Sequence, residues 1–242
     1  MSRSLEIGLD LDGTLFDPAP RHQAALVEAA RSLDVELPAD FPDRYYQDKR
    51  GGMKGREVLL RHGIPKSDEL CRAWVKLIES EQLLRLDAPF PGVLSNVEHL
   101  AAEGIGLHIC TARQREDLVL RQLTFVGLAQ LVRSVHVVHL DGCGRSLARK
   151  ACLTAGLGLS AVVGDTEVDR EWAIELGATF LALSCGLRSR EFWLARGIEP
   201  HSDMASAVRN FVAWEAGQTR RAGANADLDG GPAFQPTPQR KC

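Results

Sequence analysis

The feature that most constrains the fold of this chain is a regular alternation of short aliphatic segments with helical patterns in its second half. One more aliphatic segment, at 5–11, lies near the start of the chain. The alternating part comprises strands predicted at 106–110, 135–140, 161–163 and 180–183, and helices predicted at 115–126, 146–155 and 168–176. Strands that alternate with helices in this way form a parallel sheet with helices on both faces. We therefore expect an α/β fold whose core is a Rossmann-like parallel sheet.

A different pattern separates the first strand from this array. Helical periodicity predicts helices at 21–34 and 67–86. The segment 35–55 holds prolines and a glycine pair, so we predict that it is irregular. No strand pattern occurs between 18 and 87, which indicates an all-helical insertion.

These patterns divide the chain. We assign 1–17 and 88–216 to the α/β core and 18–87 to the helical insertion. The remaining residues, 217–242, are rich in Gly, Ala, Pro and Arg and lack apolar periodicity, so we predict a disordered tail.

Composition excludes several classes of protein. The formal net charge is −3 at pH 7 and 45% of the residues are apolar, so we expect neither a nucleic-acid partner nor an anionic membrane surface as a partner. No apolar run approaches the roughly 20 residues of a membrane span. The first residues lack the apolar stretch of a signal peptide. We therefore expect a cytoplasmic protein whose six scattered cysteines are reduced thiols.

Polar side chains follow the predicted strands where these end. The end of the first strand supplies Asp10 and Asp12, Thr111 follows the second strand, and Asp165 follows the strand at 161–163. Ligands of open parallel sheets bind at the carboxyl ends of the strands, so we expect these groups to converge there. Neighbouring segments supply further residues to the same edge, namely Ala112, Arg113, Lys150 and Asp169.

The residue types at this edge favour a metal site that handles phosphate. Carboxylates crowded together repel one another unless a cation lies between them. Carboxylate and carbonyl oxygens suit a hard cation, and Mg²⁺ takes few protein oxygens while it keeps waters. The hydroxyl of Thr111 and the amine of Lys150 suit the other oxygens of a phosphoryl group.

The same residues lie in segments that resemble the motifs of the haloacid dehalogenase-like hydrolases. Residues 10–17, DLDGTLFD, are similar to the first motif, and 109–113, ICTAR, to the second. Lys150 stands where the third motif has its basic residue, and 163–169, VGDTEVD, resembles the acidic fourth motif. Over the rest of the core, the segment 186–197 is similar to phosphoglycolate-phosphatase-like members, which carry a helical cap between the first two motifs.

The resemblance implies a phosphatase mechanism. Asp10 would be the nucleophile that forms an aspartyl-phosphate, and Asp12 would protonate the leaving oxygen and then deprotonate water. The implied catalytic residues are Asp10, Asp12, Thr111 and Lys150. The implied ligands of Mg²⁺ are Asp10, Asp12 through its backbone carbonyl, and Asp165, with Asp169 close by.

In this family the insertion would be the cap. Its basic and glycine-rich stretch 49–56 resembles the cap loop that meets the substrate, so we expect Arg50 and Lys54 to bind an anionic leaving group. The alternative is a solvated loop. On the core, the implied substrate-binding residues are Thr111, Ala112 and Arg113. We interpret the histidines on or near predicted strands as structural residues; these are His108, His136 and His139.

Some alternatives stay open. The third motif departs from the family pattern because Ala151 follows Lys150, and Arg145 and Arg149 are rival basic residues. Asp12 favours a phosphatase or a phosphomutase over a dehalogenase, whose leaving group needs no proton. Our prediction is hydrolysis of a small phosphorylated metabolite, of the phosphoglycolate or sugar-phosphate type. The alternatives are a phosphomutase, phosphonate cleavage through a Schiff base on a cap lysine (Lys49 or Lys54), and a non-catalytic binding module.

Overall fold

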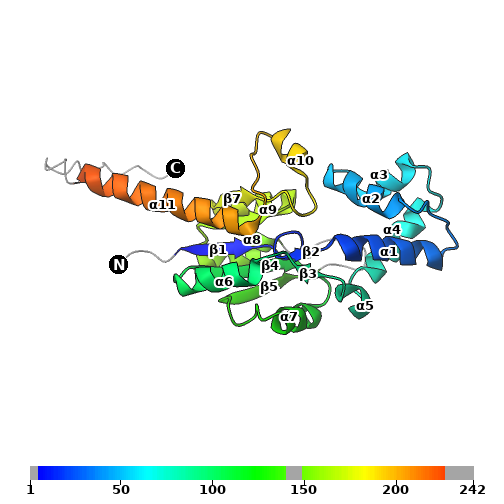
Figure 1. Ribbon diagram of the computed structural model, residues 1–242, viewed down its shortest axis with the longest axis horizontal. Helices are drawn as coiled ribbons and strands as arrows, with labels where there is room; N and C mark the ends of the chain where they lie inside the picture. Colours follow the sequence, from blue (N-terminus) through cyan, green and yellow to red (C-terminus); the bar gives the residue numbers. More distant parts are fainter. Residues whose placement is uncertain (1–4, 140–148, 227–242) are drawn as a thin grey trace, which may run out of the picture. The chain divides into compact units, whose positions relative to one another are not determined.

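The computed structural model describes residues 5–139 and 149–226. The chain forms two compact units, Met1–Ala207 and Val208–Cys242. In the first unit, one five-stranded sheet has the order β5-β4-β1-β6-β7, and all of its neighbouring strands pair in parallel (Figure 1). The strands are β1 (Glu6–Leu9), β4 (Gly106–Ala112), β5 (Ser134–Val138), β6 (Ala161–Gly164) and β7 (Thr179–Ala182). The predicted α/β fold is therefore confirmed.

Helices surround this sheet. Along the chain they are α6 (Val93–Ala102), α7 (Glu116–Phe125), α8 (Lys150–Thr154) with the 3₁₀ turn η1 (Ala155–Leu157), α9 (Glu167–Leu176) and α10 (Arg190–Leu194). Buried side chains of α8 and α9 pack against β4 and β6 on one face of the sheet, and α6 and α7 lie on the other side (Figure 1). Strand order reverses at β1, which has β4 on one side and β6 on the other. Open parallel sheets bind their ligands at such a reversal.

A helical segment connects β1 to α6. It comprises α1 (Ala19–Ser32), α2 (Phe41–Arg50), α3 (Gly55–Arg61), α4 (Ser67–Leu77) and α5 (Glu81–Leu84). Two short strands, β2 (Phe16–Asp17) and β3 (Ala88–Pro89), pair antiparallel, so the entry to this segment and the return from it lie side by side. The segment has a hydrophobic cluster of its own, in which all the buried residues lie between Leu26 and Leu70.

Two predictions about this segment are wrong. The stretch 35–55 was predicted to be irregular, yet it contains α2. Pro42 lies in the first turn of α2, where a missing N–H breaks no hydrogen bond, and Phe41, Tyr45 and Tyr46 are buried. The helix predicted at 67–86 is two helices, because the chain leaves the helical path after Ile78 and Ser80 begins α5, with its hydroxyl accepting from the Leu83 N–H.

The second unit holds most of α11 (Met204–Ala226), in which Phe211 and Trp214 stack with their ring centroids 6.1 Å apart. This helix is longer than the sequence predicted. It continues past 217 because Ala, Arg and Gln, all good helix formers, recur there. The rest of the predicted tail, 227–242, lies outside the described residues. No helix in the part of the chain described here is long and apolar enough to cross a membrane.

Candidate active site

The predicted site residues converge at the carboxyl ends of three neighbouring strands. Asp10 follows β1, Thr111 lies near the end of β4, and Asp165 follows β6. Leu9 pairs with Ile109 on one side and with Val163 on the other, so the three strands end at the same level. The side chains of these polar residues are almost completely shielded from solvent.

Lys150, the first residue of α8, joins two of these carboxylates. Its Nζ donates to Asp10 Oδ1 at 2.5 Å and to Asp169 Oδ1 at 2.7 Å, and it lies 5.2 Å from the centroid of the Trp172 ring. Burial alone would lower the pKa of Lys150, but the two carboxylates raise it above its ordinary value, so the amine stays charged. The rival Arg149 is exposed and pairs with Glu175 instead, and Arg145 lies outside the described residues.

Asp10, Asp165 and Asp169 form a buried acidic cluster, in which one oxygen from each lies within 4.8 Å of the others. Burial raises the pKa of Asp10 to about 7 although Lys150 opposes the shift, and burial also raises the pKa of Asp165 well above its ordinary value. One lysine does not balance three carboxylates. A divalent cation in the cluster would restore the balance.

Asp165 has the free oxygen that such a cation needs. The carboxylate is fully buried; its Oδ2 accepts from the Leu187 N–H, and its Oδ1 has no hydrogen-bond partner. Asp169 differs, because Lys150 holds its Oδ1 and the Thr166 N–H and hydroxyl hold its Oδ2. The residues present therefore fit a divalent cation held directly by Asp10 and Asp165, with Asp169 fixing Lys150 beside it.

Asp12 lies between two buried arginines. Its Oδ1 accepts from Arg113 at 2.5 Å and from Arg21 at 2.7 Å. Asp87 accepts from the same two guanidinium groups, at 2.8 Å from Arg21 Nε and 3.3 Å from Arg113. Burial opposes ionisation, but the two arginines hold the pKa of Asp12 below its ordinary value. Arg113, predicted to bind substrate, therefore contacts Asp12.

The geometry agrees with a comparison across the whole core. Residues 7–183, a stretch that contains every acidic and basic group just described, match the model of the haloacid dehalogenase-like hydrolases. The chain belongs to this family.

Known proteins similar to this hydrolase agree with the assignment. It is 30% identical over 194 residues to a phosphoglycolate phosphatase of Caulobacter vibrioides, a match that covers 74% of this chain and 79% of that protein. A haloacid dehalogenase-like hydrolase from Streptococcus pneumoniae superposes with a TM-score of 0.65 at 18% identity, over 87% of this chain and 100% of that one. A predicted phosphoglycolate phosphatase from Haemophilus somnus superposes with a TM-score of 0.63 at 19% identity, over 87% of this chain and 99% of that one. The two structural likenesses show the shared fold.

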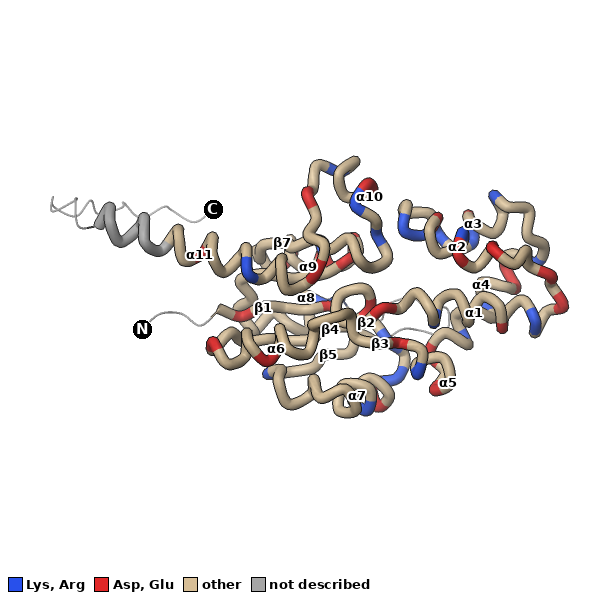
Figure 2. The backbone as a smooth tube through the Cα atoms, in the orientation of Figure 1, with Lys and Arg blue, Asp and Glu red and all other residues tan. Residues whose placement is uncertain are grey.

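Basic residues lie at the end of α2 of this hydrolase (Figure 2), and one of them, Arg50, contacts the core. Arg50 donates to the backbone carbonyls of Gly186 at 2.9 Å and Ser184 at 2.6 Å. Arg188 on the core donates to the Lys49 carbonyl at 3.0 Å. Lys54, the other predicted substrate contact, lies exposed at the start of α3.

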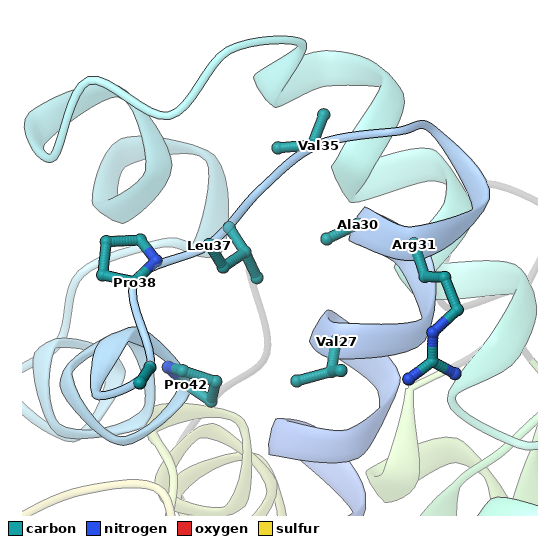
Figure 3. Close-up of a pocket in the computed structure, with 8 residues that line it drawn as sticks. Val27, Ala30, Arg31, Val35, Leu37, Pro38 and Pro42 are labelled. Atoms are coloured by element: carbon teal, nitrogen blue, oxygen red, sulfur yellow. The ribbon is translucent and has the colours of Figure 1, made fainter.

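Sequence reasoning missed Arg21 and Asp87 in the Asp12 network. Neither belongs to a motif that would have marked it, and the bond that joins Asp87 to Arg21 spans 66 positions of the sequence. A cavity of about 370 Å³ between α1, the 33–40 loop and α2 holds none of the predicted site residues (Figure 3). Its lining is mainly apolar, with Val27, Ala30, Pro38 and Pro42 around it and Arg31 at its edge. This cavity is therefore separate from the acidic cluster of the hydrolase.

Proposed function

We propose that this hydrolase is a Mg²⁺-dependent phosphatase that cleaves a small phosphorylated metabolite through an aspartyl-phosphate on Asp10. The observation that carries this proposal is the acidic cluster itself. Asp10 and Asp165 are buried at neighbouring strand ends, Asp165 Oδ1 has no hydrogen-bond partner among the described residues, and Lys150 bridges to Asp10. The relative from Caulobacter vibrioides supports a substrate of the phosphoglycolate type, and a sugar phosphate is the other form that the proposal includes.

In the first step, a carboxylate oxygen of Asp10 attacks phosphorus, and the bond from phosphorus to the ester oxygen breaks. Asp12 gives the departing oxygen its proton. In the second step, Asp12 takes a proton from water, whose oxygen attacks phosphorus and frees Asp10 with release of phosphate. Arg21 and Arg113 orient Asp12 and stabilise the carboxylate that proton donation leaves, which is the form that takes the proton from water in the second step.

Other groups stabilise the charge of the transferring phosphoryl group. Lys150 lies against Asp10 and would contact a phosphoryl oxygen, and Thr111 with the neighbouring Ala112 backbone would bind another at the end of β4. Asp10 and Asp165 would hold Mg²⁺, with Asp169 beside them. When bound, the ion neutralises the carboxylates and withdraws charge from a phosphoryl oxygen.

The inserted helices α1–α5 would act as the cap that excludes water and selects the leaving group. The contacts that support this role are those of Arg21 with Asp12 and of Arg50 with the Ser184 and Gly186 carbonyls, since both join the insertion to segments around the acidic cluster.

Phosphate release from a panel of phosphorylated metabolites, with and without Mg²⁺, tests the proposal. We expect Mg²⁺-dependent release from a narrow set of compounds and a loss of at least about 1,000-fold in Asp10→Asn, because the nucleophile is gone. Circular dichroism of the variant controls for folding. A phosphomutase would instead yield a phosphate-shifted isomer with little free phosphate. Turnover of no compound, together with unchanged partner binding in Asp10→Asn, would indicate a binding module.

A further inference from the structure

The inserted helices contain a lysine with an unusual environment. Lys49, near the end of α2, is part-buried, and its Nζ lies 3.2 Å from His22 Nδ1 on α1. The same amine lies 4.5 Å from the centroid of the Trp74 ring and 5.5 Å from that of Tyr45. The amine is thus surrounded by three rings on three helices.

No carboxylate among the described residues pairs with this amine. Burial, together with the positive charges of Arg188 and Arg21, lowers the pKa of Lys49 to about 7. A buried ammonium without a counter-charge destabilises the folded protein. Because residues 5–139 and 149–226 supply no carboxylate to this amine, we look to a bound ligand for the anion.

The surroundings of Lys49 extend to the reaction site. His22 directly follows Arg21, which bonds Asp12 at 2.7 Å. The His22 ring meets the Tyr46 ring edge-on at 5.8 Å between centroids. The Tyr46 hydroxyl is buried without a hydrogen-bond partner, in the field of the Asp165 and Asp12 carboxylates.

This orphan hydroxyl is a second observation that points to a ligand. A buried hydroxyl without a hydrogen-bond partner destabilises the folded protein, and a polar ligand atom that bonds it removes that cost. A ring contact links Tyr46 to His22, and a hydrogen bond links His22 to Lys49. The buried Tyr46 hydroxyl and an amine that has no carboxylate partner among the described residues therefore belong to one connected group of side chains.

We propose that Lys49, together with His22, binds a carboxylate on the leaving group of the substrate, so that this hydrolase selects short phosphomonoesters that carry a carboxylate. The inference rests on the proposed phosphatase function and names the substrate class within it. A carboxylate carries one charge and two oxygens, which match one amine and one imidazole N–H. A second phosphate would bring more charge and more oxygens than these two groups can satisfy.

Two substrates of matched length test this proposal. 2-Phosphoglycolate carries a carboxylate, and 2-hydroxyethyl phosphate carries a neutral hydroxymethyl group in its place. We expect the wild type to prefer the carboxylate compound by at least about 10-fold in kcat/KM, mainly through KM, because the contact is present in the bound ground state. In Lys49→Met we expect this ratio to fall to near one.

The matched control is Lys76→Met, which changes an exposed lysine on α4 in the same inserted segment. We expect it to keep the wild-type preference, and Lys49→Arg to restore part of the preference because it restores the charge. Lys49→Gln serves as a second neutral variant if Lys49→Met folds poorly.

The outcomes separate the inference from the function. Equal losses on both substrates in Lys49→Met would assign Lys49 a structural role and overturn the inference, and so would a preserved preference. If the wild type hydrolyses p-nitrophenyl phosphate or 2-hydroxyethyl phosphate but shows no preference for the carboxylate, the inference fails and the phosphatase function stands. If no phosphomonoester releases phosphate, the function itself fails, and the inference with it.

Discussion

Asp12 shows how one residue depends on contacts from two parts of the chain. Arg113 reaches it from the end of β4 and Arg21 from α1, so its carboxylate is stabilised from both the core and the insertion. The motif around Asp12 predicts that the residue is a proton donor. Its arginine partners become visible only when the structure brings the two segments together.

Asp12→Asn should therefore change both stability and catalysis. The amide leaves Arg21 and Arg113 buried without part of their counter-charge, and we expect a loss of about 1–3 kcal/mol in the free energy of unfolding. We expect kcat/KM for an alkyl phosphate to fall by about 100- to 10,000-fold, and less for p-nitrophenyl phosphate, whose leaving group needs no proton. Urea denaturation and steady-state kinetics measure the two effects.

Asp40→Asn is the control for that variant, since Asp40 forms only an exposed pair with Arg44. Its free energy of unfolding should change by less than about 0.5 kcal/mol. Equal losses of Asp12→Asn on the alkyl and aryl substrates would contradict the proton-donor role.

The lowered pKa of Lys49 predicts that the free energy of unfolding depends on pH. Its pKa in the folded protein is about 7, below its ordinary value, so between pH 7 and 10 the folded state binds fewer protons than the unfolded state and wild-type stability rises with pH. Below pH 7 the Lys49 amine is charged in both the folded and the unfolded state, so the full cost of burying an ammonium group is present. Lys49→Met should thus exceed the wild type in stability by at least about 1 kcal/mol at pH 6. That difference should shrink toward pH 10.

Urea denaturation at several pH values, with Lys76→Met as the control, measures this effect. The charged and titratable groups that face Lys49 come from several neighbouring elements. They are Arg21 and His22 on α1, Cys71 on α4 and Arg188 on the core. A stability difference that is constant from pH 6 to pH 10 would show that Lys49 titrates at its ordinary pKa.

At the scale of elements, two loops determine whether Asp165 can occupy its position. Gly13 follows Asp12 with a φ of +80°, and Gly186 lies in the loop after β7. A Cβ on either glycine would lie 2.1 Å from Asp165 Oδ2. These two backbones therefore approach the carboxylate more closely than any side chain permits.

Gly186→Ala should displace Asp165 and weaken the metal site. We expect the Mg²⁺ concentration for half-maximal activity to rise by about 10- to 100-fold, as when a neighbour of a metal ligand is changed. A Mg²⁺ titration of phosphate release measures it. Gly156→Ala is the control, because a Cβ at Gly156 meets nothing within 4 Å. An unchanged Mg²⁺ requirement in Gly186→Ala would argue against Asp165 as a ligand.

At the scale of the whole molecule, the acidic cluster links metal binding to stability. Three buried carboxylates with one lysine repel one another in the metal-free protein. A ligand that binds only the folded state at 100 times its Kd stabilises it by about 2.7 kcal/mol. Mg²⁺ should therefore raise the thermal midpoint by about 5–10 °C.

Differential scanning calorimetry with and without Mg²⁺ measures this shift, and EDTA should reverse it. Asp165→Asn removes the oxygen that has no protein partner, so its midpoint should respond far less to Mg²⁺. If Mg²⁺ raised the thermal midpoint of Asp165→Asn as much as that of the wild type, Asp165 would not be a ligand of the ion.

The sequence by itself determined the sheet and the residues at its edge. Alternating strands and helices permit few topologies, and Asp10, Asp165 and Lys150 lie at strand ends or helix starts, where local pattern fixes their place. The boundaries of the helices inside the insertion were harder to predict from the sequence. Prolines predicted an irregular segment at the place where α2 forms. The helix forms there because the burial of Phe41 and Tyr45 outweighs this local signal.

Only the tertiary structure decided which charges meet. Arg113, which was predicted to bind the substrate, bonds the Asp12 carboxylate in this structure. Lys54 is exposed, and it is Lys49 whose amine lies next to aromatic rings. These pairings join residues far apart in the chain, and their energies depend on burial and distance. Sequence pattern reports the period of an element and the chemistry at its ends. It does not report which side chains from separate elements come into contact in the buried interior.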